Sequence, residues 1–481
     1  MFNEQEKLIL GVIVFIYFIF LFGLSLYIGR KVKTYDDYNV AGRSVSIFPL
    51  ILTFVGTAIG GSILLGYMTN GYILGMGQQW MNVAVGGMSV LFILFLTKRI
   101  RMLGEKHNMV TIGDFTAMRY GEGARIPTAI SMLVAYCAIT GMQFVAIATI
   151  LNLTLGLSMT SGILIGWILL TLKTYFGGME AVIIQDAIHG TIQTLGIFAL
   201  FVVVLVLAGD WGSMASYAES MGEGSHLSIF SIAPAEVFVF MLTVGAYQFV
   251  RQDVWQRVWA AKDLKTSNNG YLISIVLSTA IGVVCVAIGV MSKYGMQMDI
   301  ANPSLIYYEI IGQVLPFPLV IVMLIALLAT VISTADSFFI SAASSIVNDI
   351  IKPKAKNFND EKMLKYSKLC VVIVSFISLF LALYIPKLVT LWITGTAMLV
   401  SGLLAPVLLG MFWKGATRQA GIISMWLGLS VATAWQLMGH PLGWHPVFIG
   451  LPVSIVTLVI VSFLTKGSEV EAVPEVDSIA E

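Results

Sequence analysis

The chain of 481 residues is 58% hydrophobic and only 11% charged, and its mean hydropathy of +0.90 lies outside the range in which a soluble domain buries its apolar residues. This composition predicts a polytopic membrane protein, and the net charge of +1 implies no nucleic-acid partner. Cys137, Cys285 and Cys370 each lie in an apolar run without paired spacing. They are expected to be free thiols, with no disulfide or metal framework.

Apolar runs of about 18 residues or more predict thirteen membrane-spanning helices. In chain order these lie near residues 8–28, 47–68, 79–97, 127–152, 157–175, 182–208, 234–256, 269–292, 316–348, 367–385, 388–412, 417–437 and 447–465. The first run is too long for a signal peptide and lacks a small-residue cleavage site, so it is expected to be a retained span.

Lysine and arginine divide unequally between the two sides of this arrangement. Of the 27 basic residues, 24 fall in one alternating set of loops and helix ends, and only Lys7, Lys293 and Lys387 fall in the other. Because basic residues concentrate on the cytoplasmic side of a membrane, the N-terminus is expected outside and the C-terminus inside. The larger set includes three residues near predicted helix ends: Lys173, Arg251 and Arg257.

Two polar segments carry no functional prediction. The outer loop 209–233 contains acidic but no basic residues, and the tail 467–481 is acidic, contains proline and is expected to be disordered in the cytoplasm. The chain holds no G-x-x-x-x-G-K-[ST] phosphate loop, so ATP-driven transport is not expected.

Two predicted spans are weakened by glycine. The second contains "TFVGTAIGGS" with Gly56, Gly60 and Gly61, and the seventh contains "FMLTVGAYQFVRQDVWQR" with Gly245 at its centre. Glycine costs a helix interior about 1 kcal/mol relative to alanine. Because the offset of five spans is odd, the two segments run in opposite directions, as a five-plus-five inverted repeat requires. The alternative is that the glycines only let helices pack closely.

The ninth span, "LLATVISTADSFFISAASSIVNDI", places three hydroxyls on one helix face: Thr330, Ser333 and Thr334 at i, i+3 and i+4. Such hydroxyls commonly bond back to the carbonyl one turn earlier, which is the structural alternative. Their density favours a polar seam. Hydroxyls together with the carbonyls of an unwound helix suit a small monovalent cation such as Na⁺.

Four segments carry a resemblance to a known family: "YDDYNVAGRSVSIFPLILTFVGTAIGGSILLGY", "YFGGMEAVIIQDAIHGTIQ", "YQFVRQDVWQRVWAAKDLK" and "ATVISTADSF". On these the chain resembles the sodium/solute symporters over nearly its whole length. The resemblance implies an all-α fold with a leucine-transporter-like core of two inverted repeats, 47–208 and 234–412. One extra helix, 8–28, would precede this core, and two extra helices, 417–465, would follow it.

The resemblance also implies functional residues. The sodium site would take the carbonyls of Gly56, Ile59 and Thr330 and the hydroxyls of Ser333 and Thr334. In the sixth span Asp186 matches an acidic position on the ion path, and its alternative is a shallow, hydrated carboxylate, because an ionised residue inside a span is costly. Tyr247 matches an aromatic residue beside the solute. Arg257 matches a basic residue for which an orienting or anchoring role and a role in transport are both open.

Departures from the family bear on the solute. Ala58 stands where the proline symporters carry an acidic residue, and of Ala58, Ser62 and Ile63 two are apolar where the sugar symporters are polar. Arg251 is expected to pair with Asp253, the alternative being a carboxylate solute. Other candidates for the solute cavity, from position alone, are Gln78, Gln79, Trp80, Tyr136, Thr140 and Gln143.

These observations predict a Na⁺-coupled symporter of a small organic solute, such as an amino acid or monocarboxylate, working by alternating access in the plasma (inner) membrane. Its partners would be the solute and the lipid bilayer, with no nucleic acid and with a monomer sufficient for transport. Proton coupling is the nearest alternative, followed by a solute-gated channel or a sensor. No catalytic residues are expected, and the five histidines have no metal-ligand spacing.

Overall fold

The computed structural model describes residues 3–354, 359–384 and 388–465, although the side chains of residues 62–63 and 388–391 are not described. The predicted disordered tail, 467–481, lies outside the described residues. Within them the regular structure is helical, and a single parallel bridge joins Val45 to Ala261. Cys137, Cys285 and Cys370 are buried free thiols, as expected.

The long helices follow one another in chain order, and most agree with the predicted spans to within a few residues. They are α1 (Glu4–Gly29), α3 (Ile47–Ala58), α5 (Gln79–Phe92), α8 (Arg125–Leu155), α9 (Met159–Leu207), α13 (Leu264–Tyr294), α15 (Phe317–Ser345), α16 (Asp360–Tyr384), α17 (Leu388–Phe412), α18 (Arg418–Leu437) and α19 (Val447–Leu464).

Shorter helices connect or complete them: α2 (Tyr35–Val40), α4 (Met68–Leu74), α6 (Lys98–His107), α7 (Ile112–Tyr120), α10 (Trp211–Ser220), α11 (Pro234–Phe240), α12 (Gln252–Ala260) and α14 (Ile306–Val314). The π-helical turns are η2 (Ser62–Tyr67), η4 (Ile93–Thr97), η7 (Met241–Gly245) and η10 (Ile346–Ile351). The 3₁₀ turns are η1 (Ala41–Arg43), η3 (Gly75–Gln78), η5 (Glu122–Ala124), η6 (Gly224–Leu227), η8 (Gln248–Val250), η9 (Pro303–Leu305), η11 (Lys352–Lys354) and η12 (Pro441–Gly443).

Ten helices among the described residues are long and apolar enough to cross a membrane. Three differences between the predicted and the observed helices explain why ten are found among the described residues where thirteen were predicted. The second span ends early, because α3 has only 12 residues, and the seventh is divided into short pieces. The fifth and sixth are joined as α9, although Gly178, with φ 65° and ψ −174°, divides it into two helices at a kink. The total of thirteen spans stays a prediction.

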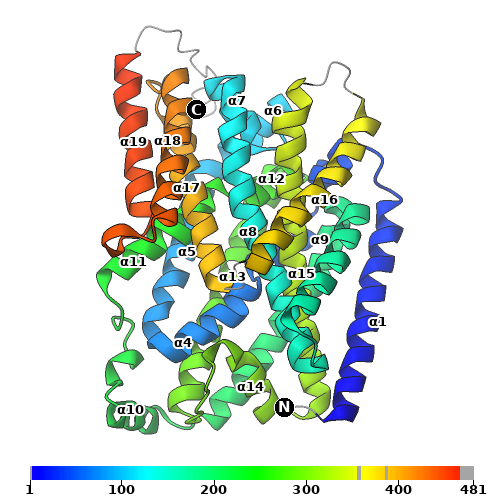
Figure 1. The fold of residues 1–481 in the computed structure, drawn as a ribbon, viewed down its shortest axis with the longest axis vertical. Coiled ribbons are helices and arrows are strands. Elements are labelled where there is room, and N and C mark those ends of the chain that lie inside the picture. Colours follow the sequence, from blue (N-terminus) through cyan, green and yellow to red (C-terminus); the bar gives the residue numbers. More distant parts are fainter. Residues whose placement is uncertain (1–2, 355–358, 385–387, 466–481) are drawn as a thin grey trace.

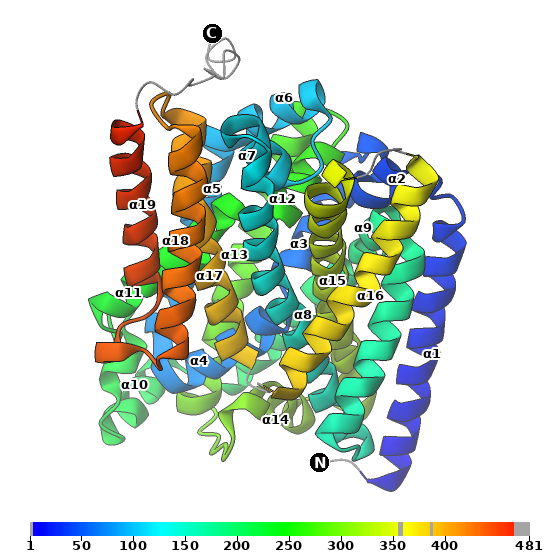
Figure 2. The ribbon, with the colours of Figure 1, turned by 45° about the horizontal axis from the view of Figure 1, so that its top comes forward.

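The helices stand side by side as a bundle (Figure 1). Helix α1 begins at the lower end of this view and α19 ends at the upper end. Helices α8 and α15 lie inside the bundle, and the residues of α15 from Leu324 to Ser345 are nearly all buried, whereas α1, α16 and α19 lie on its outside (Figure 2). The centre of the bundle therefore brings the polar face of α15 against the broken helices.

The charge count needs one correction. It placed Lys173, Arg251 and Arg257 among loops and helix ends, but the structure buries all three side chains. A charge inside a membrane protein must be paired, and each of these residues has a carboxylate partner. They therefore serve internal contacts and do not report orientation, which remains a prediction.

Candidate sodium site and solute cavity

The second predicted span breaks immediately after α3. Ile59 leaves the helical region with φ −94° and ψ 74°, and its N–H donates to the Val55 carbonyl at 3.0 Å. The last carbonyls of a helix have no intrahelical partner, so the carbonyls from Gly56 onward are freed at this end. The break supplies the backbone oxygens that the sequence predicted.

Two hydroxyls of α15 face the broken segment across a very short gap. A Cβ atom added at Gly56 would lie 2.9 Å from Ser333 Oγ, and one added at Gly60 would lie 2.8 Å from Thr334 Oγ1. Glycine at both positions therefore keeps open a space between backbone and hydroxyls that any larger residue would fill. Neutral oxygen donors around such a space fit a small cation of single charge.

The two hydroxyls keep lone pairs for a cation. Ser333 Oγ donates its proton to Asp186 Oδ1 at 2.5 Å, and Thr334 Oγ1 donates to the Thr330 carbonyl at 3.1 Å. The bond from Thr334 to the Thr330 carbonyl is the contact with the preceding turn that was the alternative to an ion site. It uses only the hydroxyl proton of Thr334. Because a hydroxyl has one proton and two lone pairs, both oxygens can still accept a cation.

Gln193, on α9, is a residue that the sequence analysis missed. Thr330 Oγ1 donates to Gln193 Oε1 at 2.7 Å, and Gln193 Nε2 reaches the Ile59 carbonyl at 3.5 Å. A single buried amide thereby ties the broken end of α3 to α15. The only signal in the sequence is an amide within an apolar span, and that signal does not identify its partners.

Asp186, also on α9, is fully buried, so the shallow, hydrated alternative is wrong. Its Oδ2 accepts from Thr53 Oγ1 at 2.6 Å and lies 3.3 Å from Arg257 Nη2. Its other oxygen accepts from Ser333, a predicted sodium ligand. The carboxylate therefore orients one hydroxyl of the sodium site while its charge is balanced by Arg257.

Arg257 anchors α12 to this centre. Its Nη2 donates to Thr57 Oγ1 at 2.5 Å and to Ser337 Oγ at 2.7 Å, and its Nε donates to Thr53 Oγ1 at 3.1 Å. The guanidinium is completely buried and joins α3, α9 and α15 to the second broken helix. The sequence left its role open between orientation and transport, and these contacts give it an anchoring role.

The second broken helix differs from its predicted form. The sequence put its weak point at Gly245, but the backbone leaves the helical region at Arg251, with φ −77° and ψ 103°. At Gly245 a Cβ atom would lie 3.2 Å from the Ala84 carbonyl and 3.2 Å from Met88 Cγ. This glycine therefore serves close helix packing, which was the alternative interpretation.

Arg251 and Asp253 form an ion pair, as expected. Arg251 Nη2 lies 2.6 Å from Asp253 Oδ2, and its Nη1 donates to Gln248 Oε1 at 3.1 Å. The guanidinium also lies 5.5 Å from the centre of the Tyr247 ring. The break before α12 is thus filled by side chains of its own segment together with Tyr136 of α8, whose hydroxyl oxygen accepts from the Gln252 N–H at 2.7 Å.

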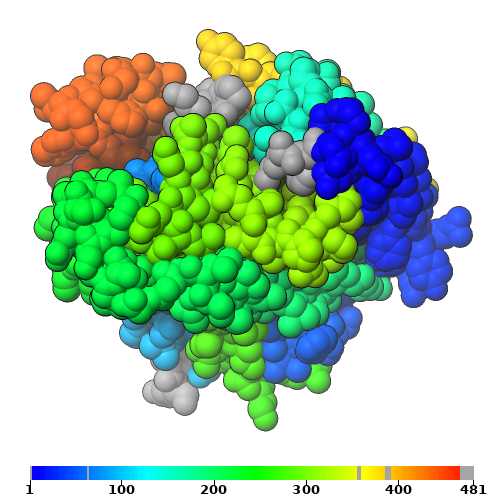
Figure 3. Space-filling model, turned by 90° about the horizontal axis from the view of Figure 1, so that it is seen from below, coloured from blue at the N-terminus to red at the C-terminus, as the bar shows by residue number. Residues whose placement is uncertain are grey.

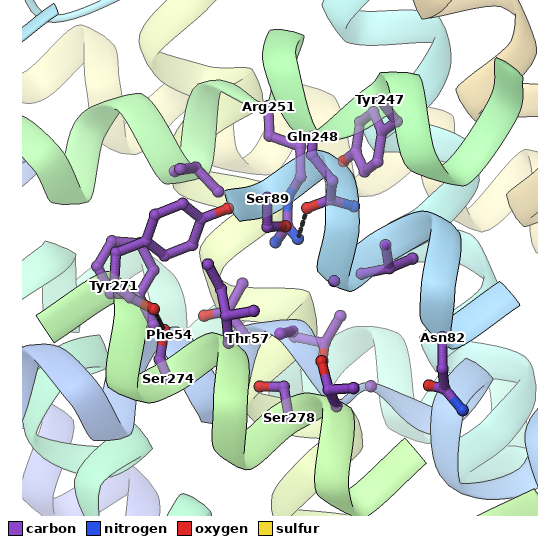
Figure 4. Close-up of a pocket in the computed structure, with 18 of the residues that line it drawn as sticks. Phe54, Thr57, Asn82, Ser89, Tyr247, Gln248, Arg251, Tyr271, Ser274 and Ser278 are labelled. Atoms are coloured by element: carbon purple, nitrogen blue, oxygen red, sulfur yellow. Dashed lines mark hydrogen bonds between the residues drawn. The ribbon is translucent and has the colours of Figure 1, made fainter. Parts of the chain in front are cut away.

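A cavity of about 70 Å³ lies between α3, α5, the second broken helix and α13 (Figure 4). Of the described residues that line it, Arg251 alone is charged, and it lies at one end, beside Gln248 and Tyr247. Gly60 and Thr334, both next to the predicted sodium site, also contribute to its wall. The cavity therefore shares residues with the ion site, carries one positive group and has no acidic side chain in its lining.

Only some of the residues predicted to contact the solute line the cavity. Ala58 and Tyr247 line the cavity. Gln79, Thr140 and Gln143 do not: Gln79 accepts from Asn82 Nδ2 at 2.8 Å, and the other two are buried within α8. The remaining candidates lie as follows: the side chain of Ser62 is outside the described residues, Gln78 and Tyr136 are buried outside the lining, and Trp80 donates to the Ile229 carbonyl.

A third buried ion pair was not anticipated. Lys173 Nζ pairs with Asp336 Oδ2, and Thr174 Oγ1 donates to Asp336 Oδ1 at 2.5 Å. The pair joins the first half of α9 to α15, one turn from Ser333. Asp336 lay within a segment already singled out, but its partner is 163 residues away, so the sequence alone gave no reason to connect them.

The outer loop 209–233 contains regular structure and contacts the helix bundle. It contains α10 and η6, and the green residues of this region extend across the lower face (Figure 3). Gly77 N–H donates to Ser231 Oγ at 3.0 Å, and Glu223 pairs with Lys293 at 2.6 Å. Partial burial acts to raise the pKa of Glu223, but hydrogen bonds from Lys293 and Tyr294 outweigh it and hold that pKa below its usual value.

A multi-pass helical membrane protein with two broken helices around a cluster of neutral oxygens belongs to the class of ion-coupled secondary transporters. The fold agrees with this class. It is similar to a structure of a Na⁺-coupled sialic acid symporter in a substrate-bound outward-open state, with a TM-score of 0.81, 17% identity and coverage of 95% of this chain and 97% of that one. It is also similar to Mhp1, a nucleobase-cation-symport-1 family transporter, with a TM-score of 0.55, 15% identity and coverage of 92% and 98%.

The family model of the sodium:solute symporter family matches residues 38–428, so the chain belongs to that family. The sodium/pantothenate symporter of Haemophilus influenzae is 25% identical over 88% of this chain and 89% of its own length. The sodium/proline symporter of Staphylococcus aureus is 23% identical over 95% and 92%. The resemblance and the sodium coupling inferred from the sequence are confirmed, and the chain is an integral, multi-pass transporter, not an enzyme.

Proposed function

We propose that the protein is a Na⁺-coupled symporter of small monocarboxylates. The observation that carries this proposal is the shared wall between the predicted sodium site and the cavity, at Gly60 and Thr334. A cation bound beside those residues adds a positive charge next to a cavity whose described lining includes Arg251, already paired with Asp253, and no acidic residue. One carboxylate complements that arrangement, whereas a cationic solute does not.

The sodium site would consist of the carbonyls of Gly56, Ile59 and Thr330 with the hydroxyls of Ser333 and Thr334. Na⁺ supplies the positive charge that brings these oxygens together, and so it favours one packing of α3 against α15. Asp186 holds the Ser333 proton, which leaves that oxygen free to accept the ion. The ion path through Asp186 is part of the proposal.

Named substrates of the relatives support an acid. Proline, pantothenate and sialic acid appear in the names of the similar proteins, and each of these molecules carries a carboxylate. In this chain the remaining N–H groups of Arg251, those not bonded to Asp253 and Gln248, would donate to that carboxylate. The side of the cavity formed by Tyr247 would stack against the solute.

The proposed transport cycle is alternating access by two inverted repeats, 47–208 and 234–412, in a bundle of thirteen spans with the N-terminus outside. A tenfold sodium gradient contributes about 1.4 kcal/mol, and one charge crossing about 100 mV contributes about 2.3 kcal/mol. Together they support roughly 500-fold accumulation of a solute without net charge, such as a zwitterion. A monocarboxylate anion cancels the charge of one sodium ion, so only the sodium gradient drives its one-to-one symport, which supports about tenfold accumulation. A monomer and one sodium ion are sufficient for useful uptake.

Uptake of radiolabelled propionate and proline into liposomes tests the proposal. With the purified protein, an inward Na⁺ gradient should drive uptake of the monocarboxylate, and an equal K⁺ or pH gradient should not. Ser333→Ala and Thr334→Ala should raise the half-saturating Na⁺ concentration by about tenfold or more, because each removes an oxygen ligand worth about 1–3 kcal/mol. Thr334→Ser, which keeps the hydroxyl, is the matched control.

Uptake driven by a proton gradient without sodium, with both alanine variants indifferent, would instead establish proton coupling. Currents that do not saturate with solute would indicate a channel.

A further inference from the structure

We infer that the protein has a subsite for the apolar arm of its solute in a groove between α5 and α13 that opens to the lipid, so that its substrates are monocarboxylates with an extended hydrocarbon chain. This inference rests on the proposed function and specifies its substrate class.

The cavity alone is too small for such a molecule. Its volume of about 70 Å³ holds only a few water-sized groups, since one water requires about 10–15 Å³ on the same measure. A carboxylate near Arg251 would occupy much of that space. Any longer solute must therefore extend through one of the cavity walls.

One wall leads to a larger space. Asn82 and Gly86 on α5 and Ile275 and Thr279 on α13 line the cavity and also line a second groove of about 670 Å³. These four residues form the part of the wall that the two spaces share. Figure 4 shows Asn82, one of the four, at the end of the cavity away from Arg251.

The groove is apolar apart from the residues it shares with the cavity. Its other walls are valine, alanine and glycine, and Val83 and Val276 on its rim are 51% and 62% exposed. Exposed valines on membrane-spanning helices face hydrocarbon, so the groove favours an apolar occupant. The shared walls identify this occupant as the arm of a solute whose head lies in the cavity.

Two adjacent glycines of α5 have different surroundings: Gly86 lets α5 and α13 approach closely at the level of the cavity, whereas Gly87 borders the open groove. A Cβ atom at Gly86 would lie 2.9 Å from Thr279 Oγ1, so the helices approach closely at that point. At the next residue, Gly87, a Cβ atom would meet no atom within 4 Å. A side chain placed at Gly87 therefore fills the groove without a clash, and a leucine there also favours the helix.

A series of straight-chain monocarboxylates tests the subsite. Na⁺-dependent thermal stabilisation of the full chain in detergent is measured with propionate, pentanoate and octanoate, against K⁺ as the reference. Affinity should rise about fourfold for each added methylene that enters the groove, the value expected for about 0.8 kcal/mol per buried CH₂. Gly87→Leu should abolish that rise and leave propionate binding unchanged.

Gly23→Leu is the matched control. Gly23 lies on α1, and a Cβ atom there also meets nothing within 4 Å, so this variant adds the same side chain to a distant lipid-facing helix. It should retain the full dependence on chain length.

The outcomes separate the subsite from the proposed function. A flat series in which propionate still binds with Na⁺ overturns the subsite and leaves the symport of small acids standing. The subsite is also overturned if affinity depends on chain length equally in Gly87→Leu and in the natural protein. It is overturned as well if Gly87→Leu loses a co-purified lipid and its dependence on chain length does not change. If no carboxylate of any length stabilises the protein in Na⁺, the proposed function itself fails.

Discussion

The two broken helices solve the problem of polar backbone inside a membrane in opposite ways. At the first break, after α3, the freed carbonyls face the neutral hydroxyls of Ser333 and Thr334 across glycine. At the second, before α12, Arg251 and Asp253 pair within the segment itself. Unsatisfied polar groups in hydrocarbon cost several kcal/mol, so each break needs compensation.

The difference determines which break can bind an ion. The second break already contains its own positive and negative charges, so an added cation gains little there. The first contains oxygen atoms and no formal charge on its immediate ligands, and its nearest carboxylate, Asp186, is balanced by Arg257. Our proposal therefore assigns the sodium ion to the first break and the solute to the side of the cavity formed by the second.

The largest expected effect comes from removing the carboxylate at each break. Asp186→Ala and Asp253→Ala each leave a buried guanidinium without its partner, which costs about 3–5 kcal/mol of stability. Only Asp186→Ala should also reduce the difference in melting temperature between Na⁺ and K⁺. Thermal unfolding in the two salts measures both quantities.

Asp36→Ala is the control, since its pair with Arg43 is longer, at 3.6 Å, and partly exposed. Its loss should cost about 0–1 kcal/mol. A sodium-dependent difference that survives in Asp186→Ala and disappears in Asp253→Ala would reverse the assignment of the two breaks.

Alanine at the two glycines gives the next largest effect. In Gly60→Ala the new methyl group lies against Thr334, where overpacking costs about 1–3 kcal/mol. That cost should appear as roughly tenfold weaker Na⁺ binding. Gly245→Ala crowds Ala84 and Met88 instead, so it should lower stability and leave the sodium affinity unchanged. Sodium titrations of the melting temperature distinguish the two.

Gln193→Leu should have a smaller effect at the first break. It removes the bond from Thr330 and the weak contact with the Ile59 carbonyl, a loss of about 1 kcal/mol, or about fivefold in Na⁺ affinity. Gln248→Leu is the counterpart at the second break, where the amide accepts from Arg251. Equilibrium ²²Na⁺ binding measures the sodium affinity of Gln193→Leu. An unchanged affinity in Gln193→Leu would show that this amide does not position the ligands.

The smallest effect concerns the segment that leads into the second broken helix. Because the folded pKa of Glu223 lies below its ordinary value of 4.5, its contacts with Lys293 and Tyr294 stabilise the loop above that pH. The contribution is lost as the pH falls through the lowered value. The protection of residues 222–233 from hydrogen exchange, relative to the intrinsic exchange rate at each pH, should therefore fall at acidic pH in the natural protein. Glu223→Gln should show low protection at every pH, with sodium binding unaffected.

The sequence by itself determined the class of the fold and the residues of the first break. Apolar length predicted the long helices to within a few residues, because a span must match the thickness of the bilayer. Gly56, Ser333 and Thr334 were also identifiable, because three glycines within six residues and a dense run of hydroxyls interrupt otherwise apolar spans.

Tertiary structure decided the contacts between distant parts of the chain. The pairs Asp186–Arg257 and Lys173–Asp336, and the link from Gln193 to Thr330, join residues that local spacing does not relate. It also decided that Gly245 serves packing and that the backbone breaks at Arg251 instead. Periodicity reports which face of a helix is polar, but only the packing of several helices determines which polar faces meet. That packing also determines where the chain can unwind, because the freed backbone groups need partners from neighbouring helices.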